Sequence, residues 1–444
     1  MSRFRSARRP LAIALPLAVV AGIAVAGQAM GEPEAEGGAR VTGSATLPDL
    51  PLAEFSNGLL AGTVADDRGV DLGGIGSDIF PTGTAGEFWT VTDRGPNGQI
   101  KVDGAKRRTF PVPGFDPAIV RIRVAGDRIE VVDSIPLTTR SGKAVTGLPN
   151  QASRDEAPYD YSASTPLEFD PNGLDTEGIV RAADGTFWLA DEYGPSLVHV
   201  AADGEILTRY VPKGLALTGA DYPVVEVLPE ILLKRKVNRG FEGLAQLPGG
   251  DLVLAVQSPL SNPDKSTGDP SRNTRLIRFN PRSGAVTAEY VYRFEPVGVV
   301  EPGQTDTAEL KLSSLVAIGS KQLLVQERTD KGARLYKVKL DASANVLGSA
   351  WDSAATSPSL EKLDNPAGAG VPVLAKKLVV DLNTLPAVPG KIEGVAVTGP
   401  STIVVINDND FGMTDGTGAF DAAGRLVDSG IETKVVTIEL GESL

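Results

Sequence analysis

Five stretches of the chain repeat one pattern of apolar and polar positions. Each has an apolar segment of five or six residues, a turn rich in Gly, Pro, Asp or Ser, and a second apolar segment rich in Val, Leu, Phe and Trp. Such a pattern is typical of a hairpin of two buried strands. The five stretches begin at Gly76, Gly173, Phe241, Leu312 and Ile392.

Further strand patterns follow most of these hairpins, for example "AIVRIRVAGDRIEVVDSI" and "RLIRFNPRSGAVTAEYVYRF". Four antiparallel strands repeated around an axis predict an all-β fold, a β-propeller of five four-stranded blades, with six as the alternative. The last stretch lacks a fourth strand, because "TKVVTIEL" ends the chain. We expect the ring to close by pairing of N- and C-terminal strands, with "GLLAGTVAD" near residue 60 as the N-terminal partner.

The first thirty residues differ from the rest. Four arginines precede the apolar run "LAIALPLAVVAGIAVAG", which is short, contains a proline and is followed by small residues. This pattern predicts a secretory signal peptide rather than a membrane anchor. We therefore expect a signal peptide over 1–29, a flexible leader over 30–56 and one propeller domain over 57–444. Insertions are expected near 138–172, 259–273 and 341–375, the first as a lid over a site and the third as a solvent-exposed excursion.

Charge and composition narrow the functional classes. Removing residues 1–29 removes four arginines and no acids, so the formal net charge changes from -13 to -17. An acidic exported chain is not expected to bind nucleic acid or anionic lipid. The chain has no cysteine, which excludes disulfides and thiolate chemistry, and its only histidine, His199, lies in an ordinary strand pattern. A Ser-His-Asp triad is therefore disfavoured.

Acidic residues recur at both ends of the hairpins. Glu177 starts one apolar segment and Asp191 ends the next, so folding the hairpin is expected to bring them together. Glu242 and Glu393 repeat the Glu-Gly start. If the inner strands line a central channel, these residues converge at one mouth of it. The expected metal ligands are Glu177, Asp191, Glu242, Glu327, Glu393, Asn407, Asp408 and Asp410. Oxygen ligands without His or Cys favour a hard cation, of which Ca²⁺ is the best choice outside the cell.

Two interpretations of these patterns remain open. A Glu-Gly pair can also be a turn device, in which the glutamate accepts hydrogen bonds from backbone N–H groups. Arg94, Arg239 and Arg328 accompany the acids, where they either neutralise them or bind an anionic substrate group such as phosphate. The basic runs at residues 107 and 234 are interpreted as solvated loop charges.

The motifs "GGIGSDIF", "FWTVTDRGPNG", "DTEGIV", "FWLADEYGP", "NRGFEGLA" and "IEGVAV" together resemble the phytase-like family described as having esterase-like activity of phytase. The resemblance extends from about residue 57 to residue 442. It implies an exported β-propeller-like protein that hydrolyses phosphoric esters. By analogy with calcium-dependent propeller phytases, it implies catalytic roles for Glu177, Glu242, Asp191 and Glu393. It also implies substrate binding by Arg94, Arg239, Arg328, Asp93 and Glu192.

The expected function is therefore metal-dependent hydrolysis of a small phosphorylated compound by an exported monomer, in the periplasm or outside the cell, without a membrane span. One alternative is a propeller lactonase or carboxylesterase with a single Ca²⁺. Another is a non-catalytic binding protein of the cell envelope with a structural cation site.

Overall fold

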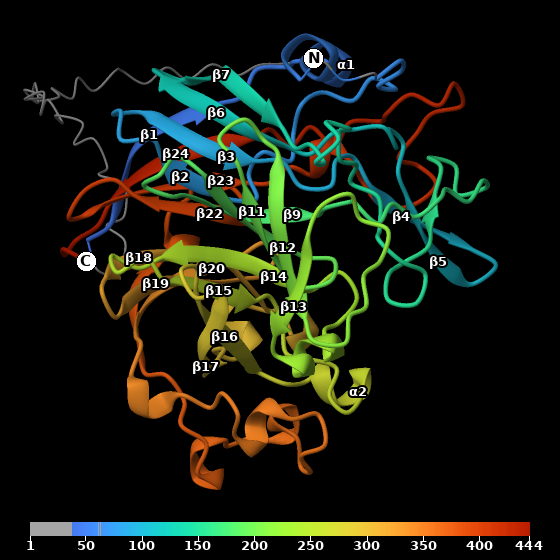
Figure 1. Cartoon of the computed structure of the whole chain (residues 1–444). Helices are drawn as coiled ribbons and strands as arrows, with labels where there is room; N and C mark the ends of the chain where they lie inside the picture. The colour runs from blue at the N-terminus through green and yellow to red at the C-terminus, as the bar shows by residue number, and fades with distance from the viewer. Residues whose placement is uncertain (1–37, 61, 63) are drawn as a thin grey trace, which may run out of the picture. The chain divides into compact units, whose positions relative to one another are not determined.

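The repeated hairpins form the inner strands of five groups of four antiparallel strands, which we call blades 1 to 5 (Figure 1). A single parallel bridge between Thr46 and Arg128 joins blades 1 and 5 into one eight-stranded sheet. The computed structural model describes residues 38–60, 62 and 64–444. Blade 1 contains β2 (Ile79–Pro81), β3 (Glu87–Val91), β6 (Ala118–Ala125) and β7 (Arg128–Pro136). Blade 2 contains β9 (Thr176–Arg181), β10 (Phe187–Asp191), β11 (Ser196–Val200) and β12 (Ile206–Pro212), extended by β13 (Val224–Leu228). Blade 3 contains β14 (Phe241–Gln246), β15 (Leu252–Val256), β16 (Asn273–Asn280) and β17 (Ala285–Arg293).

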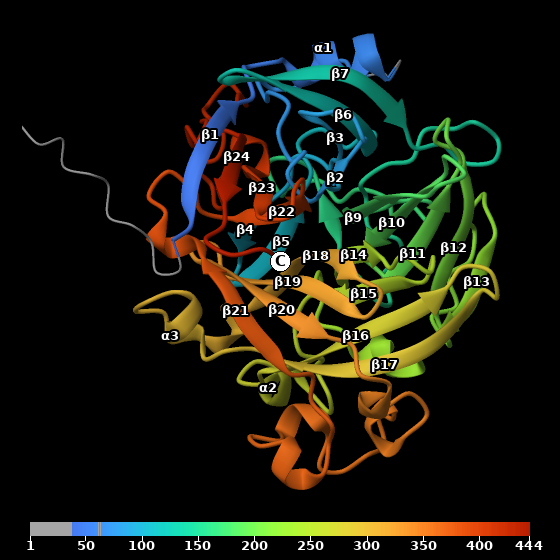
Figure 2. The ribbon, with the colours of Figure 1, turned by 90° about the vertical axis from the view of Figure 1, so that its left-hand side faces the viewer.

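The remaining strands complete the ring. Blade 4 contains β18 (Lys311–Gly319), β19 (Gln322–Arg328), β20 (Ala333–Lys339) and β21 (Lys376–Asp381). Blade 5 contains β22 (Ile392–Val397), β23 (Thr402–Asn407), β24 (Lys434–Glu439) and β1 (Arg40–Thr46). The inner strands β2, β9, β14, β18 and β22 each contact the inner strands of both neighbouring blades (Figure 2). The predicted all-β propeller fold is confirmed.

The N-terminal strand that closes the ring is not the predicted one. β1 pairs antiparallel with β24, from Arg40 opposite Glu439 to Thr46 opposite Lys434. The predicted segment spans residues 58–66, and its first two residues, Gly58 and Leu59, end helix α1 (Leu52–Leu59), which buries Leu52 and Phe55. Strand β1 therefore lies inside the segment 30–56 that the sequence predicts to be a flexible leader, whereas the predicted signal peptide lies outside the described residues. None of the described helices has the length and apolar character needed to cross a membrane.

The Glu-Gly pairs are β-bulges on the inner strands. In blade 2, Thr176 pairs with Asp191 and Gly178 pairs with Ala190, so Glu177 is the extra residue. Blades 3 and 5 repeat the same break in register around Glu242 and Glu393. A bulge leaves one residue unpaired and redirects its side chain. The three glutamates therefore leave the alternation of their strands at equivalent places in the ring.

The glycine after each of these glutamates allows neighbouring inner strands to approach closely. A Cβ atom on Gly243 would lie 2.2 Å from the carbonyl oxygen of Ser313 on β18. A Cβ atom on Gly394 would lie 2.9 Å from the backbone of Asp78 and Ile79 at the start of β2. The Glu-Gly pair thus recurs in this chain for two reasons. The bulge places the glutamate, and the close contact between strands leaves no room for a side chain at the next position.

Replacing Gly243 with Ala is expected to destabilise the fold by about 1–3 kcal/mol, because the added methyl group overlaps backbone atoms of β18. Urea unfolding measures the change. Gly249, which has open space around its Cα, is the matched control, and Gly249→Ala is expected to change stability by less than about 0.5 kcal/mol. Equal stability of the two variants would contradict the proposed reason for the glycine.

Three insertions and several short helices surround the blades. β4 (Gly98–Val102), β5 (Ala105–Thr109) and β8 (Pro158–Tyr159) form a separate three-stranded sheet, and β8 belongs to the insertion near 138–172. The insertion near 259–273 contains α2 (Lys265–Gly268), and α3 (Val297–Val300) precedes blade 4. The 3₁₀ helices are η1 (Glu230–Lys234), η2 (Thr307–Glu309), η3 (Ala342–Ala344), η4 (Ala350–Asp352), η5 (Leu360–Lys362), η6 (Ala367–Ala369), η7 (Leu382–Thr384) and η8 (Asp410–Gly412).

Candidate active site

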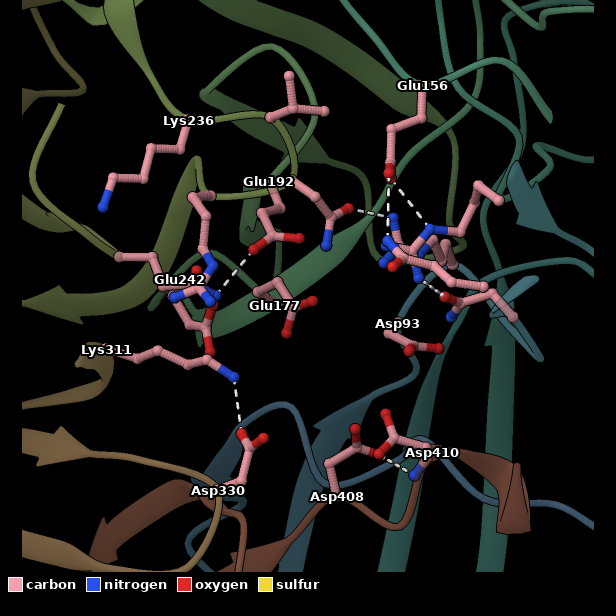
Figure 3. Close-up of a pocket in the computed structure, with 18 of the residues that line it drawn as sticks. Asp93, Glu156, Glu177, Glu192, Lys236, Glu242, Lys311, Asp330, Asp408 and Asp410 are labelled. Atoms are coloured by element: carbon pink, nitrogen blue, oxygen red, sulfur yellow. Dashed lines mark hydrogen bonds and ion pairs between the residues drawn. The ribbon is translucent and has the colours of Figure 1, made fainter. Parts of the chain in front are cut away.

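A cavity of about 970 Å³ lies where the inner strands begin, and all three bulge glutamates line it. Figure 3 shows two of them, Glu177 and Glu242, among the lining side chains. Its wall includes residues of the β4–β5 hairpin and of the insertions near 138–172 and 259–273. Glu156 represents the first insertion, which therefore forms part of a side wall. Eleven acidic and ten basic side chains line the cavity. Because the two signs are nearly balanced, the pairing of each acid decides which of them remain available to a ligand.

Glu177, Glu242 and Glu393 converge at one point. Each offers a carboxylate oxygen, and the three oxygens lie within 4.8 Å of one another. All three residues are buried. Their bulges account for this convergence, because each lifts one glutamate out of the pleat of its own inner strand.

Glu177 differs from the other two glutamates in its partners. Arg328 donates to Glu242 at 3.0 Å and also forms an ion pair with Glu393. In the part of the chain that the structure describes, the Glu177 carboxylate accepts no hydrogen bond and forms no ion pair. Burial raises the pKa of Glu177 well above its usual value, and the charges of Glu242, Asp175 and Glu393 add to the rise. Glu177 is thus a buried acid that has neither a positive partner nor a hydrogen-bond donor among the described residues.

A second acidic group adjoins Glu177. Asp175 and Glu192 can each place a carboxylate oxygen within 4.8 Å of Glu177 and of each other. Asp175 also faces Arg94, whose Nη1 lies 3.1 Å from Asp175 Oδ2. Burial and the nearby charge of Asp175 raise the pKa of Glu192. Gln257 donates to Glu192 at 2.8 Å and also to Glu242, so its amide links the two acidic groups.

Asp191 does not line the cavity, although the sequence predicts that it meets Glu177. Its carboxylate lies 2.6 Å from Nη2 of Arg209, and both side chains are fully buried. It also accepts hydrogen bonds from Ser196 Oγ at 2.6 Å and from the backbone N–H of Asp175 at 2.8 Å. The bulge explains the error, because it places Asp191 opposite Thr176. The catalytic and metal-ligand roles predicted for Asp191 are not supported by this geometry.

Glu327 and Asn407 also point away from the cavity. Glu327 accepts from the hydroxyl group of Tyr292 at 2.6 Å and forms an ion pair with Lys376 between blades 3 and 4. Asn407 accepts from the backbone N–H of Lys434 at 2.7 Å and fixes the start of β24. Both residues are at the ends of inner hairpins as predicted, but they are structural partners there rather than neighbours of Glu177.

Asp93, Asp408 and Asp410 line the cavity as the sequence predicts. Lys391 lies 2.6 Å from Asp408 and also forms an ion pair with Asp410. Burial acts to raise the pKa of Asp408, but the charge and hydrogen bond of Lys391, together with the backbone N–H of Asp410, lower that pKa on balance. The backbone N–H of Gly95 donates to Asp93 at 2.7 Å, while burial and the charge of Asp408 raise the pKa of Asp93. Lys391 therefore supplies a positive partner to Asp408 and Asp410, two of the predicted metal ligands.

The predicted arginines all line the cavity but differ in what they still offer. Arg94 is held by Asp175 and Asn238, and Arg328 by Glu242, Glu393 and Ser313. Arg239 donates to Ser258 Oγ at 3.0 Å, and its remaining N–H groups make no further hydrogen bond to the described residues. Arg94 and Arg328 thus neutralise neighbouring carboxylates, whereas Arg239 has N–H groups left to bind an anionic ligand.

Lysines near Arg239 were missed in the sequence. Lys311 lies 2.7 Å from Asp330, and burial together with the charges of Arg328 and Arg239 lowers its pKa. Lys236, in the basic run interpreted as solvated, is largely buried in the cavity wall and lies 3.2 Å from Asp269. Neighbouring Arg235 forms a buried ion pair with Asp155 at 2.5 Å. No sequence motif marks Lys236 and Lys311, because one follows η1 and the other begins β18, and only the tertiary fold brings them to the same cavity.

The donor set around Glu177 suits a hard cation. Five buried carboxylates contribute to the two groups, no nitrogen or sulfur ligand lies among them, and only some are neutralised by arginine. Ca²⁺ accepts carboxylate and amide oxygens in flexible arrangements, so these residues fit it. The positive group of Arg239, Lys236 and Lys311 on the same cavity fits an anion. The arrangement can therefore hold a cation beside an anionic substrate group.

Comparison with known proteins gives a family and a distant relative. Residues 70–411 match the family described as "Phytase-like: Esterase-like activity of phytase". An "Uncharacterized secreted protein" of Arthroderma benhamiae is 25% identical over 306 residues, which cover 58% of this chain and 59% of the relative. The chain thus matches less than two thirds of the length of that relative.

Similar solved structures are remote. The aldose sugar dehydrogenase of Streptomyces coelicolor, solved with PQQ bound, is 12% identical with a TM-score of 0.35, covering 85% of this chain and 98% of that one. An inactive virginiamycin B lyase of Staphylococcus aureus, solved with quinupristin, is 12% identical with a TM-score of 0.30, covering 83% and 98%.

Proposed function

Because the chain belongs to the phytase-like family described as having esterase-like activity of phytase, we propose that it is an exported, cation-dependent hydrolase of phosphoric esters. The observation that carries this proposal is the convergence of three bulge glutamates, of which Glu177 has no positive partner among the described residues. If each Glu-Gly pair only shaped its own turn, the three glutamates would have no reason to converge. A bound cation would give them a common partner.

The cation proposed is Ca²⁺, held by Glu177 together with Glu242 and Glu393 or with Asp175 and Glu192. When bound, it would supply Lewis-acid polarisation of the ester group. Lys391 already neutralises Asp408 and Asp410, so we do not assign these two residues to the same cation. One principal cation position, rather than a ring of several, follows from this distribution of charge.

The chain's own groups would bind and orient the substrate. Arg239 would hold an anionic oxygen of the ester, because its guanidinium donates only to Ser258 among the described residues, and Lys236 and Lys311 would add positive charge to the same cavity. Gln257 would keep Glu192 and Glu242 in place through its amide. Hydrolysis adds water across the P–O bond, so that the alcohol and phosphate are released.

Export is supported by two observations. The signal peptide predicted over residues 1–29 has the arginines and the apolar run that are typical of a secretory signal. The relative from Arthroderma benhamiae is described as secreted. Periplasmic and extracellular destinations are both consistent with this proposal, and fractionation of cells that express the full chain would separate them.

The mature protein is expected to release phosphate from a panel of small phosphoric esters when Ca²⁺ is present and to lose this activity in a chelator. Metal analysis of purified protein and phosphate release with and without chelator measure the effect. Turnover of lactones or carboxylic esters without phosphate release would instead support the propeller lactonase alternative. A fall in melting temperature on chelation with no turnover of any substrate would support a structural cation site.

A further inference from the structure

The two blades without a Glu-Gly pair carry polar residues at the equivalent positions. In blade 1 the places of the glutamate and the glycine are taken by Ser77 and Asp78, which directly precede β2. In blade 4 they are taken by Ser313 and Ser314, which lie in a register break of β18. Asp78 and Ser314 thus have side chains where the other three blades have glycine.

Asp78 is buried and links three blades. Its Oδ1 accepts from Ser314 Oγ at 3.0 Å, and its Oδ2 accepts from the backbone N–H of Ile179 at 3.1 Å. Ile179 belongs to blade 2 and Ser314 to blade 4. In the ring, blade 1 lies between blades 5 and 2, and blade 4 lies between blades 3 and 5 (Figure 2). The hydrogen bond between Asp78 and Ser314 therefore crosses the centre of the ring.

These side chains serve the free edges of inner strands. Each inner strand is the last strand of its sheet, so the N–H groups on its free edge have no partner in the ladder. A buried backbone N–H group needs such a partner. Asp78 supplies one to Ile179, and Ser314 Oγ accepts from the N–H of Val395 at 3.2 Å. Ile179 and Val395 each lie two residues after the bulge glutamate of their blade.

The third bulge glutamate is reached through β18. Ser313 Oγ, beside Ser314, donates to Glu242 at 2.8 Å. Because the two serines are adjacent in one strand, the hydrogen bond that holds Ser314 also fixes the position of Ser313. Asp78 is therefore connected to the backbone or to a hydrogen-bond partner of all three bulge glutamates, although it is not one of the residues that line the cavity.

We propose that Asp78 is a positioning residue of the candidate active site, and that through Ile179 and Ser314 it holds the inner strands so that the three bulge glutamates converge on one cation. This inference rests on the proposed function, because the cation is the one proposed there. Asp78 itself would touch neither the cation nor the substrate, since it does not line the cavity. Its effect on cation binding would come only from the placement of the glutamates.

Asparagine can replace Asp78 without loss of these hydrogen bonds. Burial raises the pKa of Asp78 to about 8, against the hydrogen bonds from Ile179, Ile79 and Ser314, so the side chain is mainly neutral at pH 7. An amide oxygen can accept from Ile179, and an amide N–H can donate to Ser314 Oγ. The Ser314 hydroxyl group can then donate to the carbonyl oxygen of Val395, which lies 3.4 Å away. Alanine at position 78 offers none of these contacts.

Calorimetric titration of Ca²⁺ into the mature protein at pH 7 tests the inference. Asp78→Ala is expected to weaken Ca²⁺ binding by about 10- to 100-fold, the range typical of groups that orient metal ligands. Asp78→Asn is expected to bind Ca²⁺ nearly as tightly as the wild type. Thr274→Val is the matched control, because it also removes a buried hydrogen bond, from Thr274 Oγ1 to the carbonyl oxygen of Val256 within blade 3. This control is expected to lose stability in urea but to keep the wild-type Ca²⁺ affinity.

Unchanged Ca²⁺ affinity in Asp78→Ala, an equal loss in Thr274→Val, or a failure of Asp78→Asn to restore binding would overturn the positioning role and leave the proposed function intact. If Asp78→Ala does not fold, Ser314→Ala takes its place, since it removes the hydrogen bonds to Asp78 and Val395 but keeps Ser313. Unchanged affinity in that variant would also overturn the role.

The outcome for the proposed function is read separately. Weaker Ca²⁺ binding in Asp78→Ala, restored in Asp78→Asn, supports the positioning role even if the wild type hydrolyses no phosphoric ester. A wild-type protein that binds no Ca²⁺ would refute the proposed cation site, and the positioning role with it.

Discussion

Glu177→Gln is expected to lower phosphate release at least about 100-fold while leaving the fold intact. Substitution of groups that merely support a metal ligand commonly costs about 10- to 100-fold in affinity or activity, and we propose Glu177, which belongs to both acidic groups, as a direct ligand. The amide keeps the volume of the side chain but removes the negative charge that would bind Ca²⁺. Steady-state kinetics at saturating Ca²⁺, together with calorimetric titration of Ca²⁺, measure the loss.

The same substitution is expected to stabilise the cation-free protein. Burial and neighbouring acids raise the pKa of Glu177, so the native state binds more protons than the unfolded state. This contribution is complete below the usual pKa of about 4.5 and is lost as pH rises, which predicts that cation-free wild-type protein becomes less stable towards neutral pH. Glu177→Gln should reduce that slope, and Ca²⁺ should raise the melting temperature of the wild type more than that of the variant.

Glu168→Gln is the control for this experiment, because Glu168 is exposed and does not line the cavity. Its activity, Ca²⁺ affinity and melting temperature are expected to match those of the wild type. Full activity and unchanged Ca²⁺ binding in Glu177→Gln would show that the bulge glutamates are structural.

The propeller could be predicted because its signal is repeated and local. Alternating apolar segments and turns specify each hairpin, and five similar hairpins specify a ring. The closing strand is predicted in the wrong segment, because Arg40–Thr46 contains a glycine and few apolar residues and is held as a strand by its pairing with β24. A strand whose identity depends on a partner about 390 residues away carries a weak signal of its own.

The site was predictable to the extent that one rule governs it. The three Glu-Gly starts identified Glu177, Glu242 and Glu393, because the same bulge places each of them. The ends of the hairpins follow no such rule. A bulge on one strand changes which residue faces its partner, and sequence spacing does not reveal it. Lys311 and Lys236 could not be predicted for another reason, since the tertiary fold brings them to the cavity from parts of the chain that share no repeated pattern.

Asp191→Asn is expected to have the opposite effect to Glu177→Gln, with a loss of about 3–5 kcal/mol in the free energy of unfolding. Arg209 is fully buried and would keep its charge without the carboxylate that now lies 2.6 Å away. Breaking a buried ion pair by removing one partner typically costs this much, because an uncompensated charge remains in the interior. Urea unfolding in chelator isolates the effect from any stabilisation by Ca²⁺.

A double-mutant cycle with Arg209→Met assigns the loss to the pair. If the stranded charge causes most of it, the double variant is expected to be more stable than Asp191→Asn alone, because no buried charge is left unpaired. The folded fraction of Asp191→Asn should retain phosphate release within a few-fold of wild type, since Asp191 faces Arg209 and Ser196 rather than the cavity. Near-wild-type stability with strongly reduced turnover would return Asp191 to the active site. Together the two variants distinguish the roles of Glu177 and Asp191, which lie fourteen residues apart in one hairpin. Glu177 is expected to bind a ligand, and Asp191 to stabilise the blade through Arg209.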